Sequence, residues 1–191
     1  MRIIGITGGI GMGKTTISNY LATAHHLPVL DADLIAREAV EPGSPILSQI
    51  IDQYGSSLIR LDGSLDRSKL GSIIFSDPAE RTWLEQQIHP FVRKKLETER
   101  DRLAYSTLVM VIPLLFEAQM TDLVTEIWVV SCPESQQIQR LMQREKLSLE
   151  QAQARIRSQM SIEEKRDRAD HILDNSTTLE ALMQQVDRAL S

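Results

Sequence analysis

The sequence predicts an α/β fold of the P-loop nucleotide-binding class, and three features indicate it. A G-x-x-x-x-G-K-T motif at residues 8–15 directly follows a short apolar run at residues 3–7. A continuous apolar run at residues 108–112 is typical of a strand covered on both faces, and residues 126–130 are expected to form a further strand. Segments that carry helix-capping signals lie between the strands. We therefore expect one open sheet with helices packed against it.

The residue types of the motif suit a bound triphosphate. Glycines at positions 8, 11 and 13 permit backbone conformations that turn successive N–H groups toward phosphate oxygens. Lys14 would place its charge on the β- and γ-phosphates of ATP, and the Thr15 hydroxyl would ligate Mg²⁺. The helix that follows would direct the positive end of its dipole at the anion. A dinucleotide-binding fold is the rival interpretation of the glycines, but it does not account for the Lys-Thr pair.

Composition and length bound the molecule further. At 191 residues, with 42% hydrophobic and 25% charged residues, the chain suits one substantial core with small insertions. A net charge of −5 argues against nucleic acid as a partner, because phosphate backbones bind clustered Lys and Arg. The single Cys132 precludes an intramolecular disulfide, and no apolar stretch reaches the length of a membrane span. The apolar N-terminal run breaks at Gly8, too early for a signal peptide, so we expect a cytoplasmic protein, monomeric or weakly homo-oligomeric, without membrane contacts.

Two carboxylates follow the second expected strand. The apolar pair Val29-Leu30 leads into Asp31 and Asp33, and ligands of open α/β sheets bind at the carboxyl ends of strands. We expect Asp33 to act on the substrate, while Asp31 orients Mg²⁺ waters or backbone groups. The alternative is that Asp33 merely caps the helix expected over residues 34–40.

Residues 34–105 contain no persuasive strand, and we expect them to form a helical insertion. Several helices are expected there, the last of them beginning at Asp77. Pro90 follows His89 within that helix and is expected to kink it or force a restart, because proline removes a backbone donor. An insertion directly after the second strand is a natural place for the acceptor-substrate site.

The third strand, at residues 108–112, argues against two classes of P-loop protein. It ends in Pro113, where a motor ATPase would carry an acidic residue. The chain also lacks an N-K-x-D motif, which counts against a GTPase. A small P-loop kinase remains as the interpretation.

Residues 134–168 are expected to form a helical lid rich in arginine. Its first helix carries Arg140 and Arg144, which share one face because they are four residues apart. Capping boxes at Ser148 and Ser161 begin two further helices. Arginines of a mobile lid would close on the transferring phosphoryl group, whose equatorial oxygens need cations, and Arg140 is the first candidate. The alternative is a solvated charged face, because acidic neighbours neutralise much of this charge.

The remaining signals are structural. A fifth strand is expected at residues 171–175, whereas His25 and His26 read as solvated residues at a helix end. The four histidines show no metal-site spacing. The last helix is expected to turn an apolar stripe toward the core: Leu179, Leu182, Val186 and Leu190.

Taken together, these motifs resemble the dephospho-CoA kinase family over nearly the whole chain. The P-loop is shared by many families, whereas the Asp-Ala-Asp, His-Pro and Pro-Leu-Leu-Phe-Glu motifs are much more specific. The matching elements are Thr7-Gly8-Gly9-Ile10-Gly11 with Gly13-Lys14-Thr15, Asp31-Ala32-Asp33 with Ile35-Ala36-Arg37, Glu41-Pro42-Gly43, Leu65-Asp66-Arg67 with Leu70 and Phe75, Ile88-His89-Pro90, Pro113-Leu114-Leu115-Phe116-Glu117, Gln139-Arg140 with Arg144, and Ala169-Asp170 with Asp174-Asn175. One departure is Ser176, where the family often has glycine.

The resemblance implies a nucleoside-monophosphate-kinase-like fold: a single P-loop kinase domain over residues 1–191, with a five-stranded parallel sheet, a CoA-binding insertion and a lid. It implies transfer of the γ-phosphoryl group of ATP to the ribose 3′-hydroxyl of dephospho-CoA, the last step of CoA biosynthesis. Asp33 would be the general base, assisted by Lys14 and by Arg140 from the lid. ATP would be bound by Gly11, Met12, Gly13, Lys14, Thr15, Thr16, Arg144 and Asn175. The acceptor site would comprise Asp33, Arg37, His89 and Glu117.

Two other functions are open to the same residues. One is a kinase for a different small acceptor, such as a nucleoside monophosphate, bound in the insertion. The other is a nucleotide-gated binding module without acceptor chemistry, in which Asp33 would be only a helix cap. Acceptor-stimulated formation of ADP separates the two kinases from the binding module, and a screen of acceptors separates the kinases from each other.

Overall fold

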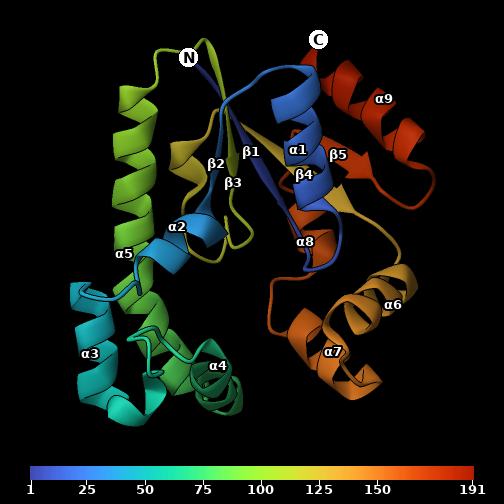
Figure 1. Cartoon of the computed structure of the whole chain (residues 1–191). Helices are drawn as coiled ribbons and strands as arrows, with labels where there is room; N and C mark the ends of the chain where they lie inside the picture. The colour runs from blue at the N-terminus through green and yellow to red at the C-terminus, as the bar shows by residue number, and fades with distance from the viewer. The chain divides into compact units, whose positions relative to one another are not determined.

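A computed structural model describes the backbone of residues 1–191 and every side chain except those of Phe75 and Ser76, so the Phe75 side chain of the family motif lies outside the described residues. The chain divides into two compact units (Figure 1). The sheet unit comprises Met1–Asp31 and Leu103–Ser191, and the helical unit comprises Ala32–Arg102. No helix among the described residues is long and apolar enough to cross a lipid bilayer.

The sheet unit is built on five parallel strands in the order β2-β3-β1-β4-β5. The strands are β1 (Arg2–Gly8), β2 (Val29–Asp31), β3 (Thr107–Val111), β4 (Glu126–Ser131) and β5 (His171–Asp174). Strands β3 and β1 are buried along almost their whole length, because helices cover both faces of a parallel sheet. This architecture confirms the predicted fold class.

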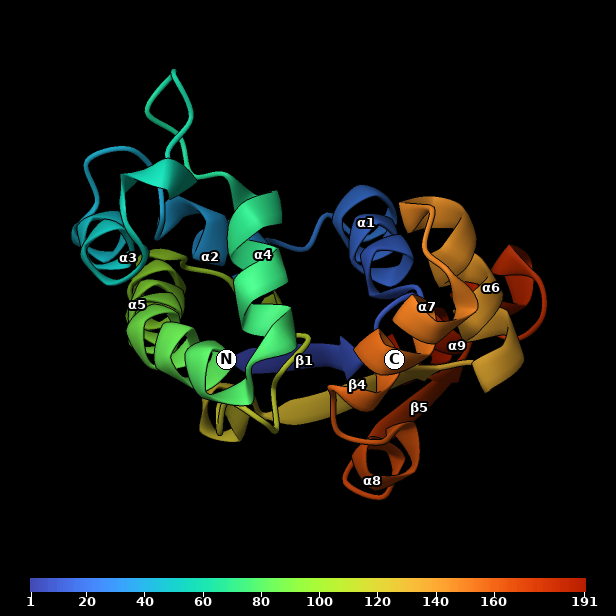
Figure 2. The same ribbon diagram turned by 90° about the horizontal axis from the view of Figure 1, so that it is seen from below.

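Helices α1 (Lys14–Ala24) and α9 (Leu179–Leu190) cover one face of the sheet, and α8 (Ile162–Arg166) lies on the other (Figure 2). Ile6 of β1 and Trp128 of β4 join Leu182 and Val186 of α9 in one apolar core. The predicted α9 stripe is wrong at its first member, because the side chain of Leu179 is 61% exposed. Leu179 begins the helix directly after an exposed loop, so its side chain does not reach the core.

The end of α1 also differs from expectation. His25 was expected to be solvated, but its Nε2 lies 2.9 Å from Oδ1 of Asp187 on α9. The His25 ring also packs edge-on against Tyr20, whose hydroxyl donates to the same carboxylate at 3.0 Å. These contacts tie the C-terminal end of α1 to α9 and therefore explain the partial burial of His25.

The predicted lid region contains α6 (Glu134–Glu145) and α7 (Leu149–Arg157), followed by α8. Both predicted capping boxes are present, at Ser148 and at Ser161, where each serine side chain accepts a backbone N–H of the first turn. Pro133 is the N-cap residue of α6 and has extended dihedral angles. The short helix η2 (Thr121–Leu123) leads into β4.

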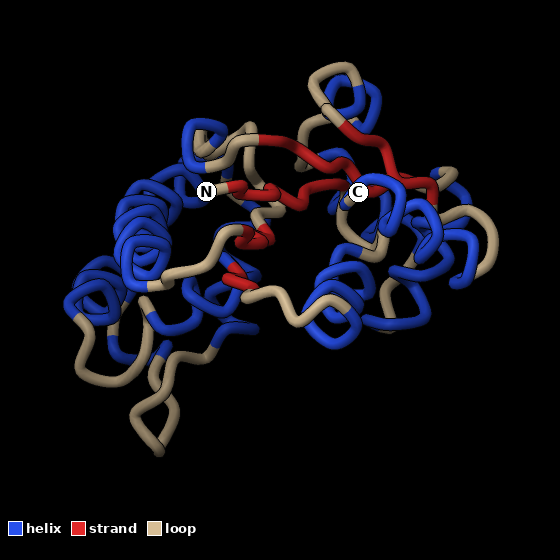
Figure 3. The backbone as a smooth tube through the Cα atoms, turned by 90° about the horizontal axis from the view of Figure 1, so that it is seen from above, coloured by secondary structure: helices blue, strands red, loops and turns tan.

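The helical unit consists of helices joined by loops, drawn blue and tan in Figure 3. It contains α2 (Ala32–Glu38), α3 (Pro45–Tyr54), η1 (Ser56–Leu58), α4 (Arg67–Ser76) and α5 (Pro78–Arg102). An isolated bridge pairs Ile59 with Leu65 around a turn. Its own apolar core includes Leu47, Ile50 and Leu84, which allows this unit to pack around α5 independently of the sheet.

Helix α5 runs through Pro90 as one helix, so the predicted restart is wrong. Proline inside a helix costs about 3 kcal/mol, because it removes one hydrogen bond and crowds the preceding turn. The buried residues Leu84, Val92 and Leu96 lie on both sides of Pro90. Each contributes about 1.5–3 kcal/mol of apolar burial, so packing outweighs the local penalty and keeps both halves helical.

Arg2 at the start of β1 is expected to stabilise the sheet unit. Its guanidinium donates to the carbonyl oxygens of Ala189 and Leu190 at the end of α9, at 2.9 and 2.6 Å, and to Glu126 at 2.8 Å. A cation at a helix C-terminus satisfies carbonyls that lack helical partners. We expect Arg2→Met to lower the free energy of unfolding by about 2 kcal/mol in urea denaturation. The matched control Arg102→Met removes a side chain that is 77% exposed, so its effect should stay within about 0.5 kcal/mol.

Candidate active site

The P-loop connects β1 to α1 at the carboxyl edge of the sheet. Gly13 is the N-cap residue of α1 and has φ 103°, a left-handed conformation that favours glycine. A Cβ at Gly13 would overlap the side-chain amide of Asn175, and a Cβ at Gly8, with φ 141°, would overlap the carbonyl oxygen of Val130. The loop therefore has no room for larger residues at these two positions, which supports the prediction from the motif.

Lys14 folds back over the loop that precedes it. Its Nζ donates to the carbonyl oxygens of Gly8 and Gly9, both at 2.9 Å. The ammonium group is thereby held against the start of the P-loop, and Lys14 itself is the first residue of α1. A cation and a helix N-terminus at one place form a site suited to a phosphate group.

Three side chains from distant segments fix the peptide groups of the P-loop. The side-chain amide of Gln137 on α6 donates to the Ile10 carbonyl oxygen at 2.8 Å, and that of Asn175 donates to the Met12 carbonyl oxygen at 2.8 Å. The Oε1 of Gln159 accepts the Ile10 N–H at 2.9 Å. Asn175 was predicted to bind nucleotide, whereas Gln137 and Gln159 were missed. A glutamine in a polar stretch gives no sequence signal, because only the fold shows what its side chain contacts.

The two predicted lid arginines differ in their surroundings. An Nη2 of Arg140 donates to the Asn175 carbonyl oxygen at 2.9 Å, so this guanidinium lies at the carboxyl end of β5. Arg144 is exposed and pairs with Glu145 at 2.5 Å, and Glu145 also pairs with Arg155. Acidic neighbours therefore do neutralise part of the charge. Contact of either arginine with a phosphoryl group stays a prediction.

The predicted base and two of the predicted acceptor residues lie in the helical unit. Asp33 is exposed in the first turn of α2, two residues after β2 ends at Asp31. Arg37 follows one turn later on the same face of α2 and is also exposed. His89 is half-buried on α5, the helix against which α2 packs. The structure therefore gathers these three residues on one unit, and their roles stay predictions.

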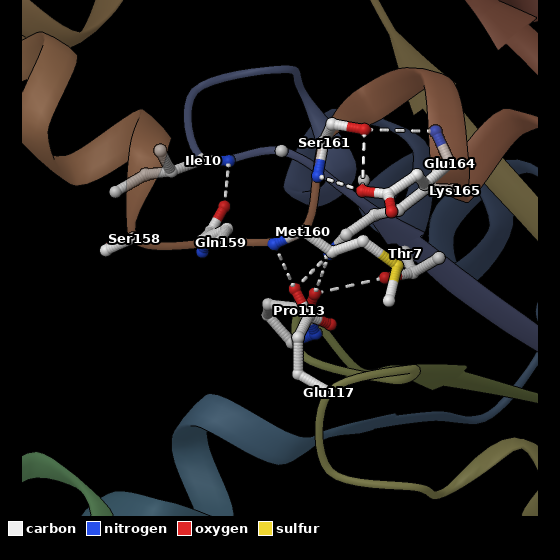
Figure 4. A network of polar contacts seen from close by, with 12 residues as sticks. Thr7, Ile10, Pro113, Glu117, Ser158, Gln159, Met160, Ser161, Glu164 and Lys165 are labelled. Atoms are coloured by element: carbon white, nitrogen blue, oxygen red, sulfur yellow. Dashed lines mark hydrogen bonds and ion pairs between the residues drawn. The ribbon is translucent and has the colours of Figure 1, made fainter.

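Glu117, also predicted at the acceptor site, belongs to a polar network of the sheet unit (Figure 4). Its Oε1 lies 2.9 Å from the Nζ of Lys165 and accepts the Met160 N–H at 3.0 Å. Lys165 is fully buried and also donates to the Pro113 carbonyl oxygen at 3.0 Å. The burial of Lys165 was not predicted, because the acidic and basic residues around it read as a solvated face.

The residues at the P-loop fit the Mg²⁺ ion that the sequence predicts to accompany ATP. Thr15 is exposed at the first turn of α1 and carries a hydroxyl oxygen, the ligand type that Mg²⁺ prefers. No group of three or more His, Cys, Asp or Glu side chains among the described residues is arranged to hold a metal ion. A single protein ligand is nevertheless sufficient, because Mg²⁺ is usually bound by one or two side chains together with substrate phosphates and water.

A cavity of about 830 Å³ lies behind the P-loop. Met12, Cys132, Gln137 and Gln159 contribute to its lining, whereas Lys14 and Thr15 do not. Burial raises the pKa of the Cys132 thiol, which the positive charge of Arg140 offsets only in part. The thiol is therefore protonated at neutral pH, and Cys132 is not expected to act as a nucleophile.

Comparison with known proteins identifies the family. The family model described as dephospho-CoA kinase matches residues 2–181. The dephospho-CoA kinase of Trichormus variabilis is 60% identical over 190 residues, which cover 100% of this chain and 97% of that protein. The solved dephospho-CoA kinase from Campylobacter jejuni aligns with a TM-score of 0.72 at 30% identity, covering 100% of this chain and 96% of the other. A solved Thermus thermophilus protein aligns with a TM-score of 0.82 at 38% identity, covering 99% and 96%. The resemblance seen in the motifs is thus confirmed, and this chain belongs to the dephospho-CoA kinase family.

Proposed function

We propose that this protein transfers the γ-phosphoryl group of ATP to the ribose 3′-hydroxyl of dephospho-CoA, giving CoA and ADP. The observation that carries the proposal is the full-length likeness to dephospho-CoA kinases, at 60% identity for the Trichormus variabilis enzyme. The P-loop, whose peptide groups are fixed by three side chains and contacted by the Lys14 ammonium group, supports the binding of ATP. The transfer proceeds directly from ATP to the hydroxyl, without a phosphoenzyme.

Asp33 is the general base in this mechanism. A sugar hydroxyl is a weak nucleophile, and a carboxylate that accepts its proton as the new bond forms accelerates the attack. Two observations support this role: the Asp33 side chain is exposed, and it follows the carboxyl end of β2 by two residues. Ligands of parallel sheets bind at such strand ends.

The P-loop side of the reaction rests on charge neutralisation. Phosphoryl transfer has a loose transition state, with negative charge spread over the equatorial oxygens. Residues 11–16 bind the phosphates of ATP, Lys14 contacts the β- and γ-phosphates, and Arg140 approaches from the lid. Mg²⁺, held by Thr15 and the phosphates, supplies further positive charge when bound. Arg144 and Asn175 contact the nucleotide as well.

Residues 34–105 bind the acceptor and residues 134–168 act as the lid. Arg37 carries a charge suited to the phosphates of dephospho-CoA, and it lies on the same face of α2 as Asp33. His89 on α5 contributes a hydrogen-bonding side chain. Glu117 was predicted to contact the acceptor as well, but its Oε1 is engaged by Lys165 and by the Met160 N–H, and we do not include it among the acceptor-binding residues.

The test is release of ADP from Mg·ATP with and without dephospho-CoA, with the product identified by mass. We expect strong stimulation by dephospho-CoA and formation of CoA, whereas a nucleoside monophosphate should give no stimulation. Stimulation by the monophosphate instead would point to another acceptor class. Slow ATP turnover that no acceptor stimulates would favour a nucleotide-gated binding module.

A further inference from the structure

Lys165 is the only lysine or arginine among the described residues whose side chain is fully buried. Burying an ammonium group is unfavourable unless it gains a charged partner and hydrogen bonds. Lys165 gains both, since its Nζ lies 2.9 Å from Glu117 Oε1 and donates to the Pro113 carbonyl oxygen at 3.0 Å. Thr7 of β1 donates to the same carbonyl oxygen at 3.1 Å. Lys165 therefore anchors α8 to the carboxyl ends of β1 and β3.

The ion pair also holds a short segment of the chain. Residues 158–161, which we call the linker, join the end of α7 to the start of α8. The Met160 N–H in the linker donates to Glu117 Oε1 at 3.0 Å. Glu117 thus contacts both the linker and the buried ammonium group through one oxygen (Figure 4).

The linker in turn contacts the P-loop. Gln159, the residue before Met160, accepts the Ile10 N–H through its Oε1 at 2.9 Å. Figure 4 shows this contact on one side of the linker and the Glu117 contact on the other. A continuous chain of polar contacts therefore runs from Lys165 through Glu117 and Met160 to Gln159 and the P-loop.

The pair is poorly explained by stability alone. The second oxygen of Glu117, Oε2, is buried and has no hydrogen-bond partner among the described atoms. An ion pair with an unsatisfied oxygen forfeits part of what its charges could gain, and apolar replacements of buried ion pairs are often as stable as the originals. Buried polar groups of this kind are used to fix one geometry among several.

We propose that Glu117 and Lys165 are positioning residues, which set the conformation of the P-loop for ATP by fixing the linker and, through it, Gln159. The inference rests on the proposed function in that it takes the P-loop as the site of ATP. Neither residue touches the reacting atoms in this role. The effect should therefore fall on the use of ATP and leave the affinity for dephospho-CoA unchanged.

The test replaces both charges at once, because removing one alone leaves an unpaired buried charge and destabilises the protein. In the double variant Glu117→Met/Lys165→Met we expect kcat/KM for ATP to fall by about 10–100-fold, as for small displacements of a positioned substrate. The KM for dephospho-CoA should stay within about 2-fold, and the thermal unfolding midpoint near that of the parent. Calorimetric binding of ADP should weaken in parallel.

A matched control carries the same substitutions at another ion pair of the sheet unit. Arg2 and Glu126 pair at 2.8 Å at the amino ends of β1 and β4, at the opposite edge of the sheet from the P-loop. Arg2→Met/Glu126→Met is expected to lower stability and to leave kcat/KM for ATP unchanged. A loss of ATP use in both double variants alike would assign the effect to general destabilisation and overturn the inference.

A double-mutant cycle tests the route through Gln159. If the pair acts on the P-loop through Gln159, Gln159→Leu alone should lower kcat/KM for ATP about as much as Glu117→Met/Lys165→Met does. The triple variant that combines all three substitutions should have a kcat/KM little lower than that of Gln159→Leu or of the double variant. If the fold-losses in kcat/KM of Gln159→Leu and of the double variant multiply in the triple variant, the pair does not act through Gln159. A change confined to the KM for dephospho-CoA would place Glu117 at the acceptor site instead. If the parent protein makes no CoA but the Glu117→Met/Lys165→Met variant binds ADP more weakly than the parent, the inference is upheld and the proposed function is refuted.

Discussion

Asp33→Asn is expected to lower kcat by about 10²–10⁴-fold, the contribution typical of a positioned general base. The amide keeps the size and shape of the side chain but cannot accept the proton of the attacking hydroxyl. ATP binding should change little, because the proton that Asp33 is expected to accept belongs to the acceptor hydroxyl and not to the nucleotide. Steady-state kinetics together with calorimetric binding of an ATP analogue measure the two effects separately.

Asp52→Asn provides the matched control for this change. Asp52 is exposed on α3 of the same unit, and its replacement should leave kcat unchanged. A parent-like kcat in Asp33→Asn would remove Asp33 from the mechanism and leave it as a residue at the start of a helix. Equal loss of kcat and of ATP binding would indicate that the side chain supports the nucleotide site rather than the proton transfer.

Lys14→Met is expected to reduce kcat/KM for ATP by about 10³-fold. The Nζ of Lys14 lies 2.9 Å from the carbonyl oxygens of Gly8 and Gly9 and is the cation expected to contact the phosphates. Removing one donor that faces developing negative charge lowers kcat by about 10²–10³-fold. The fold should be retained, because methionine keeps most of the side-chain length. Kinetics with saturating dephospho-CoA and a circular dichroism spectrum check both points.

Lys94→Met serves as the control for Lys14→Met, since Lys94 is exposed on α5 and is expected to have no part in the reaction. Near-normal kinetics in Lys14→Met would contradict the assignment of the P-loop as the ATP site. Loss of the circular dichroism signal would mean that the kinetic loss reports unfolding, and the more conservative Lys14→Arg would then be the variant to compare.

Local patterns in the sequence were sufficient for most of the fold. The strands, the P-loop and the capping boxes at Ser148 and Ser161 each depend on residues close together in the chain, and all were predicted. The predictions were wrong where tertiary packing, and not the local sequence, determines the conformation or the burial of a residue. Pro90 lies inside a continuous helix because buried residues flank it, and Leu179 is exposed because its helix begins beyond the core.

The candidate site was predictable only in part, for a related reason. Lys14 and Asp33 follow from a motif and a strand end, which are local features. Gln137 and Gln159 contact Ile10 across 127 and 149 residues of sequence, so neither their spacing nor their residue type indicates the contact. The buried Lys165 lies in a highly charged stretch, and only the fold distinguishes it from its solvated neighbours.

The central claim is a single in-line transfer from ATP to the ribose 3′-oxygen, and its most direct test is the stereochemical course at phosphorus. The enzyme would be supplied with dephospho-CoA and an ATP analogue whose γ-phosphorothioate is chiral through isotopic labelling. We predict inversion of configuration in the thiophosphoryl group that the product carries on its 3′-oxygen, because one in-line displacement inverts the phosphorus centre. Retention would require two successive displacements through a phosphoenzyme and would contradict the mechanism.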